Sequence, residues 1–471
     1  MATRTAIWWI RRDQRLVDNA ALHAAMSNAD QIVPLFILDD QLLSSRYSSD
    51  KRTAFMFAGL RSLDEDLRAI GGSLIVRRGN PIEVLRQVIQ ETSAAGIFAE
   101  HDFSPYATRR DSNVVNQLPL TLLSQPSVAH PDDVLKKDGS PYTVYTPYSK
   151  AWKASNPDAP HLEPAPERIT VPEIESHSLP ETPKLPESVP FEAGYAAAHH
   201  RLKQFTEGND APVFTYEEQR NRIDLDATSR MSPYLRFGMI SPREAIAAAM
   251  RALDNAPSRD ARHSAETWLN ELIWREFYVA ILHHFPYVRT IEFQDQYRGM
   301  HWINDTEDRS AWENAETGYP IVDACIRQLH SEGWMHNRGR MITASFLVKH
   351  LLVDWRAGEE HFMQHLLDGD PASNNGGWQW TAGTGTDAAP YFRVFNPILQ
   401  SRRHDPSATF IRKWIPELTN VPDRFIHEPW TMSQSDQQES GCAIGADYPE
   451  PIVEHTFARQ RALAAYKQSD G

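Results

Sequence analysis

One predicted helix carries a carboxylate, a cation and large aromatic rings on the same side. Within residues 263–286, intervals of three or four residues relate Trp268, Glu271, Trp274, Arg275 and Tyr278, and such intervals place side chains along one helix face. Aromatic rings can stack on a flat heterocyclic ligand while charged groups bind its polar edge. The alternative is an exposed Glu271–Arg275 ion pair beside an aromatic core, because such pairs are common at this spacing.

A second candidate is the polar stretch 368–393. It combines Asp368 and Asp370 with an Asn-Asn-Gly-Gly sequence, Trp378, Trp380 and a further run of Gly and Thr. Because the stretch has almost no hydrophobic periodicity, we expect a loop whose aromatic side chains form the wall of a pocket. An ordinary surface loop is the alternative, since loops tolerate unusual compositions.

Two further segments could bind a phosphate. Residues 337–341 begin a predicted helix with two arginines, where free backbone amides and positive side chains suit an anion, although arginines near a helix start are often solvated. Thr228, Ser229 and Ser232 surround a turn that leads to Pro233, and their hydroxyls and amides could cradle a phosphate. An ordinary helix cap is the alternative for this turn.

The composition excludes several classes of site. The 471 residues include 2 Cys and 13 Trp and carry a net charge of −14. Two cysteines cannot form a disulfide framework or a four-cysteine metal site, and no zinc-spaced His/Glu set, nucleophile elbow or P-loop is visible, so we predict no metal site. We find no signal peptide and no apolar run of membrane-span length, and therefore expect a cytoplasmic protein with no membrane association.

The charge is unevenly distributed along the chain. The acidic total argues weakly against a nucleic-acid partner. However, basic residues outnumber acidic ones in the segments 327–349 and 393–413. Solvated helix faces are the alternative explanation for both segments.

Strands alternate with helices in the first part of the chain. Strands are expected at 5–10, 31–38, 73–78 and 95–100 with amphipathic helices between them, which indicates a doubly wound parallel sheet. No G-x-G-x-x-G motif follows the first strand, so a dinucleotide site of the usual kind is not expected. The RRDQRLVDN loop after that strand could hold a ligand or form a structural Arg/Asp network.

The periodicity changes twice further along the chain. Prolines recur from about residue 125 to 195, which disfavours long helices, and a helical pattern follows Phe191. We therefore predict an α/β domain at 1–130, a Pro-rich connector at 131–195 and an all-helical domain at 196–471.

Taken together, these segments resemble the class I cyclobutane pyrimidine dimer photolyases of the photolyase/cryptochrome superfamily. The residues from RRDQRL to PYTVYTPYSKAW are similar to the antenna domain of that family. In the helical half, the motifs are NELIWREFY (270–278), TGYPIVDACIRQL (317–329), GWMHNRGRM (333–341), SFLVKHLLVDWR (345–356) and NNGGWQWTAGTGTDAAPYFRVFNP (374–397). The resemblance implies a Rossmann-like antenna domain followed by a helical FAD-binding domain.

The resemblance also implies a non-covalent, U-shaped FAD. Asn374 would lie near the flavin N5, and Arg340 would pair with Asp368 beside the ring. A second chromophore, such as a folate or a deazaflavin, could occupy the antenna domain. The residues expected to bind FAD are Tyr216, Thr228, Ser229, Arg230, Met231, Ser232, Arg275, Arg340, Asp368, Gly369, Asp370 and Asn374.

The implied function is light-driven repair of UV-damaged DNA by a monomeric enzyme. Excited reduced FAD would donate an electron to a flipped-out cyclobutane pyrimidine dimer, the ring would split, and the electron would return. Glu271 would stabilise the charge that develops on the dimer. Trp302, Trp355 and Trp378 match the family's electron-transfer chain from the surface to the flavin. The residues expected to contact DNA are Arg220, Glu271, Trp274, Tyr278, Asn337, Arg338, Met341, Trp380 and Gln400.

Three other functions are compatible with parts of this pattern. A cryptochrome photoreceptor without repair activity is opposed by Asn374 and Trp380. A (6-4) photolyase would have a pair of histidines where this chain has Asn337 and Met341. A flavin-free nucleic-acid-binding protein would be colourless when purified.

The chain departs from the family pattern at three single residues and in one three-residue segment. Gly339 is expected to loosen the start of its helix by roughly 1 kcal/mol, because glycine loses more backbone freedom than a bulkier residue does. We expect these departures to affect the details of the site more than the function of the protein. They are Met231, Gly339, His350 and the Pro371-Ala372-Ser373 segment.

Overall fold

The computed structural model describes residues 3–123, 128–156 and 158–469. The chain divides into two compact units, and neither is one continuous segment. The first unit comprises Met1–Glu217, Thr228–Pro286 and Leu367–Ala372, and the second comprises Glu218–Ala227, Tyr287–Leu366 and Ser373–Gly471. The domain boundaries after residues 130 and 195 stay a prediction.

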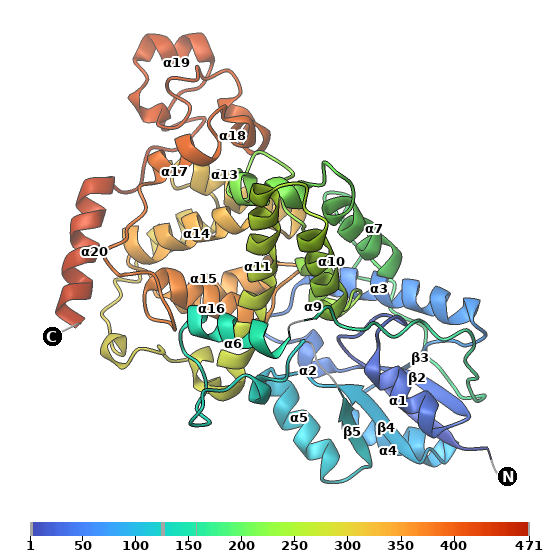
Figure 1. Ribbon diagram of the computed structural model, residues 1–471. Helices are drawn as coiled ribbons and strands as arrows, with labels where there is room; N and C mark the ends of the chain where they lie inside the picture. The colour runs from blue at the N-terminus through green and yellow to red at the C-terminus, as the bar shows by residue number, and fades with distance from the viewer. Residues whose placement is uncertain (1–2, 124–127, 157, 470–471) are drawn as a thin grey trace. The chain divides into compact units, whose positions relative to one another are not determined.

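The first unit contains a parallel sheet of five strands in the order β3-β2-β1-β4-β5 (Figure 1). All six residues of β1 are buried, as expected for a parallel strand that is covered on both sides. The four predicted strands are confirmed to within two residues, and a fifth, β5, was not predicted. The strands are β1 (Thr5–Ile10), β2 (Gln31–Leu38), β3 (Ile75–Arg78), β4 (Gly96–Glu100) and β5 (Leu120–Leu123).

Helices pack on both faces of this sheet, so the predicted doubly wound fold is confirmed. Trp8 of β1 belongs to one buried cluster together with Leu22 and Leu60 from helices on one face. Trp9, its neighbour, points to the opposite face and shares a second cluster with Leu85. These helices are α1 (Ala20–Asn28), α2 (Asp40–Leu43), α3 (Asp50–Ala69), α4 (Pro81–Thr92) and α5 (Pro105–Val115).

The loop that follows β1 forms a network of buried ion pairs. Arg15 Nη2 lies 2.7 Å from Glu100 Oε1, and Arg11 pairs with Asp111. The indole N–H of Trp8 donates to Asp13 Oδ2 over 2.9 Å. Burial raises the pKa of Glu100 to about 7 despite the neighbouring guanidinium. The structural Arg/Asp network is therefore the interpretation that the contacts of this loop support.

The predicted connector contains a helix of 11 residues, α6 (Tyr145–Ser155). Farther along, the segment packs against the sheet domain: the Ile169 N–H donates to Ile70 O over 3.0 Å, and the Ile32 N–H donates to Thr170 O over 2.8 Å. Proline richness therefore excludes neither a helix nor regular backbone pairing here.

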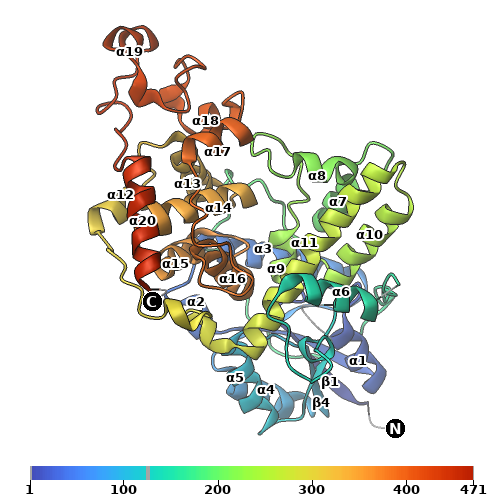
Figure 2. The same ribbon diagram turned by 60° about the vertical axis from the view of Figure 1, so that its left-hand side comes forward.

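The remaining helices of the first unit include two long neighbours. The helices α10 and α11 lie side by side in both views (Figure 1 and Figure 2). Because α11 runs for 26 residues, side chains four residues apart can line one face over several turns. The helices are α7 (Tyr195–Thr206), α8 (Tyr216–Gln219), α9 (Ser232–Phe237), α10 (Pro242–Asp254) and α11 (Arg259–His284).

The second unit is helical, as predicted for this half of the chain. The helices α17 and α18 both pack against α13. A π-helical turn at Phe346–His350 extends α14. Among the described residues, no helix is long and apolar enough to cross a bilayer. The helices are α12 (Thr306–Glu313), α13 (Pro320–Glu332), α14 (Asn337–Ser345), α15 (Trp355–His365), α16 (Pro371–Ala382), α17 (Pro397–His404), α18 (Thr409–Trp414), α19 (Gln434–Ser440) and α20 (His455–Ser469).

Candidate functional site

The expected polar and aromatic face of α11 is partly confirmed. Glu271, Trp274, Arg275 and Tyr278 are all half-buried, as ligand-contacting side chains should be. Trp268 is 2% exposed and packs against a phenylalanine ring, so its grouping with this face was wrong and it is a core residue.

One face of Trp274 is covered by an aromatic ring from the predicted connector. The rings of Trp274 and Tyr145 are stacked with centroids 3.8 Å apart and planes 5° apart. The Tyr145 hydroxyl donates to Asn270 O over 2.8 Å. This helix in the connector therefore fixes the orientation of the indole.

Arg275 lies beside a different carboxylate from the one suggested by its spacing. Its Nη1 is 3.5 Å from Glu276 Oε1, and burial lowers the pKa of Arg275. Burial also raises the pKa of Glu276 to about 7, although Arg275 and the amides of Val128 and Ala129 oppose that shift. Arg275 is thus a half-buried cation next to a buried carboxyl group that is easily protonated.

Predicted FAD residues 368–370 lie among half-buried arginines of the first unit. Arg236 Nε donates to Gly369 O over 2.7 Å, and Arg12 Nη2 lies 2.7 Å from Asp370 Oδ2. Burial, together with Arg12, lowers the pKa of Arg236 to about 9, and burial lowers that of Arg52 to about 10.

The lowered pKa values of Arg236 and Arg52 mean that burial disfavours their charged forms. An anionic ligand beside them would stabilise the charged forms. This donor set suits an anionic group. Arg12, Arg52 and Arg236 were not among the residues predicted to bind FAD, because no local spacing links them to residues 368–370.

The stretch 371–382 is helical, so the interpretation of this part as an irregular loop was wrong. Asp370 Oδ1 accepts the Ala372 N–H over 3.0 Å at the start of α16, and Pro371 occupies a position where its missing N–H costs nothing. Later in the helix, Asn374 Nδ2 donates to Glu359 O over 3.0 Å and Gln379 Nε2 donates to Val288 O over 2.8 Å. Tertiary hydrogen bonds therefore select a helix that the local pattern did not indicate.

The turn at residues 228–232 is held through its backbone. Arg201 donates to Thr228 O over 2.7 Å and to Ser229 O over 3.1 Å. Arg230 adopts a left-handed conformation with φ +52. Met231 occupies the N-cap of α9 without a side-chain cap, so the ordinary helix-cap interpretation is not supported. The turn and the buried Tyr216 both belong to the first unit.

Three arginines of the second unit form a basic patch, which we define as Arg220, Arg338 and Arg403. Burial lowers the pKa of Arg338 to about 10, and Arg220 and Arg403 add to this effect. Arg338 Nη2 also donates to Asn221 Oδ1 over 2.6 Å. Cations held together in this way suit phosphate groups.

Two neighbouring arginines of the basic segment 393–413 have different partners. Arg402 pairs with Glu428, whereas Arg403 acts electrostatically on Arg338. The excess of basic residues in the sequence indicated this segment, but it could not show that Arg402 and Arg403 have different partners.

The other predicted DNA contacts in the second unit vary in exposure. Asn337 is exposed and its Nδ2 lies 3.8 Å from Met341 Sδ one turn later. Met341, Trp380 and Gln400 are half-buried. Arg340 Nε donates to Met335 O over 2.8 Å. The predicted pairing of Arg340 with Asp368 and the DNA roles of these residues stay predictions.

The three tryptophans of the expected electron-transfer chain belong to one hydrophobic cluster of the second unit. Trp302, Trp355 and Trp378 are 9%, 0% and 2% exposed, so Trp302 is the most accessible, as a route that begins at the surface requires. Trp355 Nε1 donates to Glu292 Oε1 over 3.2 Å. Electron transfer through these rings stays a prediction.

Gly339 is explained by close packing. A Cβ atom at this position would lie 2.8 Å from Cys325 Sγ and 3.1 Å from Met335 Cγ. A bulkier residue would therefore require the side chains of Cys325 and Met335 to shift.

His350 also depends on its neighbours. Its Nε2 lies 2.9 Å from His455 Nδ1, and burial together with His455 lowers the pKa of His350 to about 3.

Replacing His350 with glutamine is expected to flatten the acid side of the stability profile. The folded protein keeps this imidazole neutral, whereas the unfolded chain takes up a proton below pH 6.5, so stability falls as the pH drops through that value. Between about pH 7.5 and about pH 5.5, protonation of this histidine in the unfolded chain should lower the free energy of unfolding of the wild type by about 1.4 kcal/mol. The H350Q variant should not show this part of the decrease. Urea unfolding at the two pH values measures the difference. His200→Gln, at an exposed histidine, is the control, and equal pH dependence in H350Q and wild type would contradict the assignment.

Comparison with protein families accounts for both halves of the chain. Residues 6–168 match the family described as DNA photolyase. Residues 268–468 match the family described as FAD binding domain of DNA photolyase.

Individual relatives match over almost the whole chain. The deoxyribodipyrimidine photo-lyase of Halobacterium salinarum is 39% identical over 485 residues, which cover 99% of each chain. That of Escherichia coli is 37% identical and covers 98% of each chain. A class III photolyase structure from Agrobacterium tumefaciens superposes with a TM-score of 0.91 at 35% identity, covering 100% of this chain and 98% of that one. A Synechocystis cryptochrome gives 0.90 at 29% identity, covering 99% of each.

The assignment to class I stays a prediction, since the similar structures include a class III enzyme. The sheet domain, the helical half and the whole-length identity to photo-lyases agree with one another. The chain belongs to the DNA photolyase family of the photolyase/cryptochrome superfamily.

Proposed function

We propose that this protein is a light-dependent DNA-repair enzyme that splits cyclobutane pyrimidine dimers. The observation that carries this proposal is the 39% identity to a deoxyribodipyrimidine photo-lyase over 99% of both chains. The basic patch supports it, because phosphate contacts position a protein on DNA and the chain is otherwise acidic.

The cofactor proposed for this reaction is FAD. When bound and reduced, FAD supplies the electron that opens the cyclobutane ring under blue light. Of the residues that the resemblance assigns to FAD, Arg275 and the residues 216, 228–232 and 368–370 belong to the first unit and would bind it there. Half-buried arginines around Gly369 and Asp370 would compensate the negative charge of the diphosphate.

The chain's own residues would act mainly on the extruded dimer. A dimer pairs and stacks poorly, so it costs less to extrude than an intact base. Trp274, held by Tyr145, would offer a ring for stacking, and Arg338 with Asn337 would hold the flanking backbone. Glu271 would place a hydrogen-bonding group where charge develops on the dimer.

Repair can be tested directly with an oligonucleotide that contains one defined thymine dimer. We expect the full-length protein with fully reduced flavin to restore the two thymines under blue or near-UV light but not in the dark, as measured by chromatography of the strands. Persistence of the dimer under illumination would contradict repair and would favour the photoreceptor alternative.

Replacing Glu271 with alanine is expected to weaken binding of dimer-containing DNA by about tenfold, the effect of losing one hydrogen bond to a charged group of about 1.4 kcal/mol. The repair yield per absorbed photon should also fall. Affinity measured by fluorescence anisotropy and flavin content measured by absorbance separate this effect from loss of the cofactor. Glu266→Ala, at an exposed position of the same helix, is the control, and wild-type repair by E271A would remove Glu271 from the site.

We also propose that the protein is a cytoplasmic monomer with a second chromophore in the sheet domain. Its cysteines, Cys325 and Cys442, are buried and unpaired, which suits a reducing compartment. An archaeal photolyase from Sulfolobus tokodaii, which is 30% identical with a TM-score of 0.82, was solved with two FAD molecules. Light scattering tests the oligomeric state, and chromatography of the released chromophores tests for a folate, a deazaflavin or a second FAD.

A further inference from the structure

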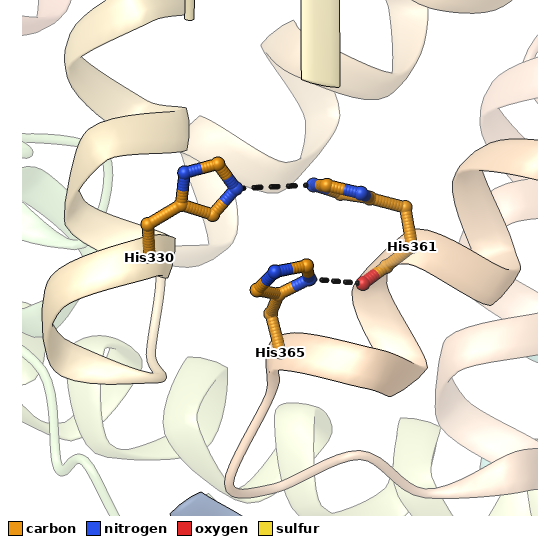
Figure 3. A group of neighbouring side chains, drawn as sticks. All are labelled: His330, His361 and His365. Carbon is orange, nitrogen blue, oxygen red and sulfur yellow. Dashed lines mark hydrogen bonds between the residues drawn. The ribbon is translucent and has the colours of Figure 1, made fainter. Parts of the chain in front are cut away.

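Three histidines of the second unit converge at one place outside the predicted flavin and DNA residues. His330 lies near the end of α13, and His361 and His365 occupy successive turns of α15. The three rings surround a common space (Figure 3). One ring nitrogen of each histidine lies within 4.8 Å of those of the other two. No role in flavin binding, electron transfer or DNA binding accounts for this arrangement.

The spacing of the nitrogens is close to that of a metal centre. His330 Nε2 and His361 Nε2 are 3.3 Å apart. Two imidazole nitrogens on a tetrahedral ion with bonds of about 2.0–2.1 Å lie roughly 3.3 Å from each other. His365 follows His361 by four residues, an interval that places both rings on one face of α15.

The groups that orient these rings are also present. His365 Nδ1 lies 2.8 Å from His361 O, so this backbone carbonyl accepts the Nδ1–H and the ring is fixed with Nε2 on its opposite edge. On His361, the Nδ1 atom faces Glu313 Oε1 at 4.0 Å, while its Nε2 faces His330. Metal-binding histidines commonly direct their second nitrogen to a carboxylate or a carbonyl in this way, which fixes the ring and raises its basicity. Arg309 Nε, 2.7 Å from Glu313 Oε1, in turn holds that carboxylate.

Access from solvent and the choice of ion follow from the same surroundings. His330 and His365 are half-buried, so an ion can reach their nitrogens, whereas His361 is 7% exposed and anchors the inner side. Imidazole is a ligand for Zn²⁺, Cu²⁺, Ni²⁺ and iron rather than for Mg²⁺ or Ca²⁺. Three protein ligands leave the fourth position of a tetrahedral ion for water.

We propose that His330, His361 and His365 form a site for a divalent transition-metal ion of the Zn²⁺ type, with Glu313 orienting His361. The site joins α13 to α15, so a bound ion stabilises the folded second unit. The sequence contains the His361-x-x-x-His365 spacing, but the third ligand comes from a separate helix 31 residues away from His361. That distance explains why the sequence led us to expect no metal.

A second group, Asp132, His283 and His284 of the first unit, serves as an internal comparison. His283 Nε2 already lies 3.1 Å from Asp132 Oδ1, His284 Nε2 lies 3.2 Å from Pro131 O, and Asp132 is exposed. The Pro131 carbonyl lies outside the group and occupies His284 Nε2, and the exposed Asp132 is open to water, so we expect the second group to bind Zn²⁺ more weakly.

The test uses full-length, flavin-loaded protein without a histidine tag, freed of metal by a chelator. Titration with Zn²⁺, followed by calorimetry, is expected to show one tight site per chain. H365Q and H330Q, at half-buried positions that tolerate a polar replacement, should each weaken it at least about tenfold, and Glu313→Gln should weaken it by about tenfold. His283→Gln and His200→Gln should leave the affinity unchanged.

A second readout reports where the ion binds. Trp312 is fully buried, and its ring lies 5.2 Å from that of His361. Binding of one equivalent of Cu²⁺ should therefore quench tryptophan fluorescence in the wild type and in Trp414→Phe, with a smaller loss in Trp312→Phe and none in H365Q. Absence of stoichiometric Zn²⁺ binding, or binding that H283Q abolishes and H365Q does not, would overturn the proposal. Unchanged flavin absorbance and melting temperature confirm that each variant is folded.

Discussion

Replacing Trp378 with phenylalanine is expected to abolish light-driven reduction of the bound flavin while leaving repair by chemically reduced protein intact. The expectation rests on the resemblance that makes Trp378 one of the three tryptophans of the electron-transfer chain. Phenylalanine fills much of the same space but is far harder to oxidise than an indole. The ring would keep its packing against Phe362, whose centroid is 4.9 Å away.

The structure indicates that phenylalanine at position 378 would disturb the surroundings little. No described residue accepts a hydrogen bond from its indole N–H, so phenylalanine removes no such bond. The far edge of the indole lies against Gly358, where the absence of a side chain makes room for it, because a Cβ there would be 2.1 Å from Cη2. The fold should therefore survive with a small void.

The measurement is the rate at which flavin absorbance changes under blue light in the absence of oxygen with an external electron donor. Trp312→Phe is the matched control, because its ring lies 6.1 Å from that of Trp378 but is not part of the expected chain. A wild-type rate of photoreduction in W378F would remove Trp378 from the route, and a loss in W312F alone would assign that role to Trp312.

Gly238→Ala is expected to destabilise the first unit by roughly 3 kcal/mol or more, since a left-handed alanine costs about 1–2 kcal/mol and overpacking about 1–3 kcal/mol. Gly238 ends α9 with φ +61, and its Cβ would lie 1.9 Å from the backbone oxygen of Arg12. Backbone atoms cannot move aside as the end of a side chain can. The contact also joins α9 to the loop after β1, where Arg15 Nη1 donates to Gly238 O over 3.2 Å.

Gly441→Ala separates the two contributions. Gly441 ends α19 in nearly the same conformation, with φ 66, but no atom lies within 4 Å of its Cβ position. We expect G441A to lose only the conformational part, about 1–2 kcal/mol. Thermal and urea unfolding of both variants measure the difference, and equal losses would show that contact with the Arg12 backbone adds nothing.

The sequence predicted the elements whose signal is local. The strands at 5–10 and 31–38 are continuous apolar runs because both faces of the sheet are covered, and such runs are readable without a structure. By contrast, β5 has four residues, none of them buried, and was missed. The helix at 371–382 was missed because Asn374 and Gln379 stabilise it through partners in other segments.

In the candidate site, too, residues related by local spacing were predicted, whereas residues from distant segments were not. Intervals of three and four residues on α11 grouped Glu271, Trp274 and Arg275, which are half-buried, but wrongly included Trp268, which packs against Phe205 of α7. The arginines around residues 368–370 and the third member of the histidine group come from distant segments, and no spacing in a single sequence could connect them. Motif resemblance supplied the roles that spacing could not.

The ion pair between Arg12 and Asp370 has a consequence for how the chain is made. Its two residues are separated by 358 positions, and residues 367–372 belong to the first unit. A ribosome must therefore add 358 residues after Arg12 before the carboxylate that receives this guanidinium exists. Although the sheet is translated first, the unit that contains it is completed only when residues 367–372 have been made, so a nascent chain carries this unit unfinished for several hundred residues.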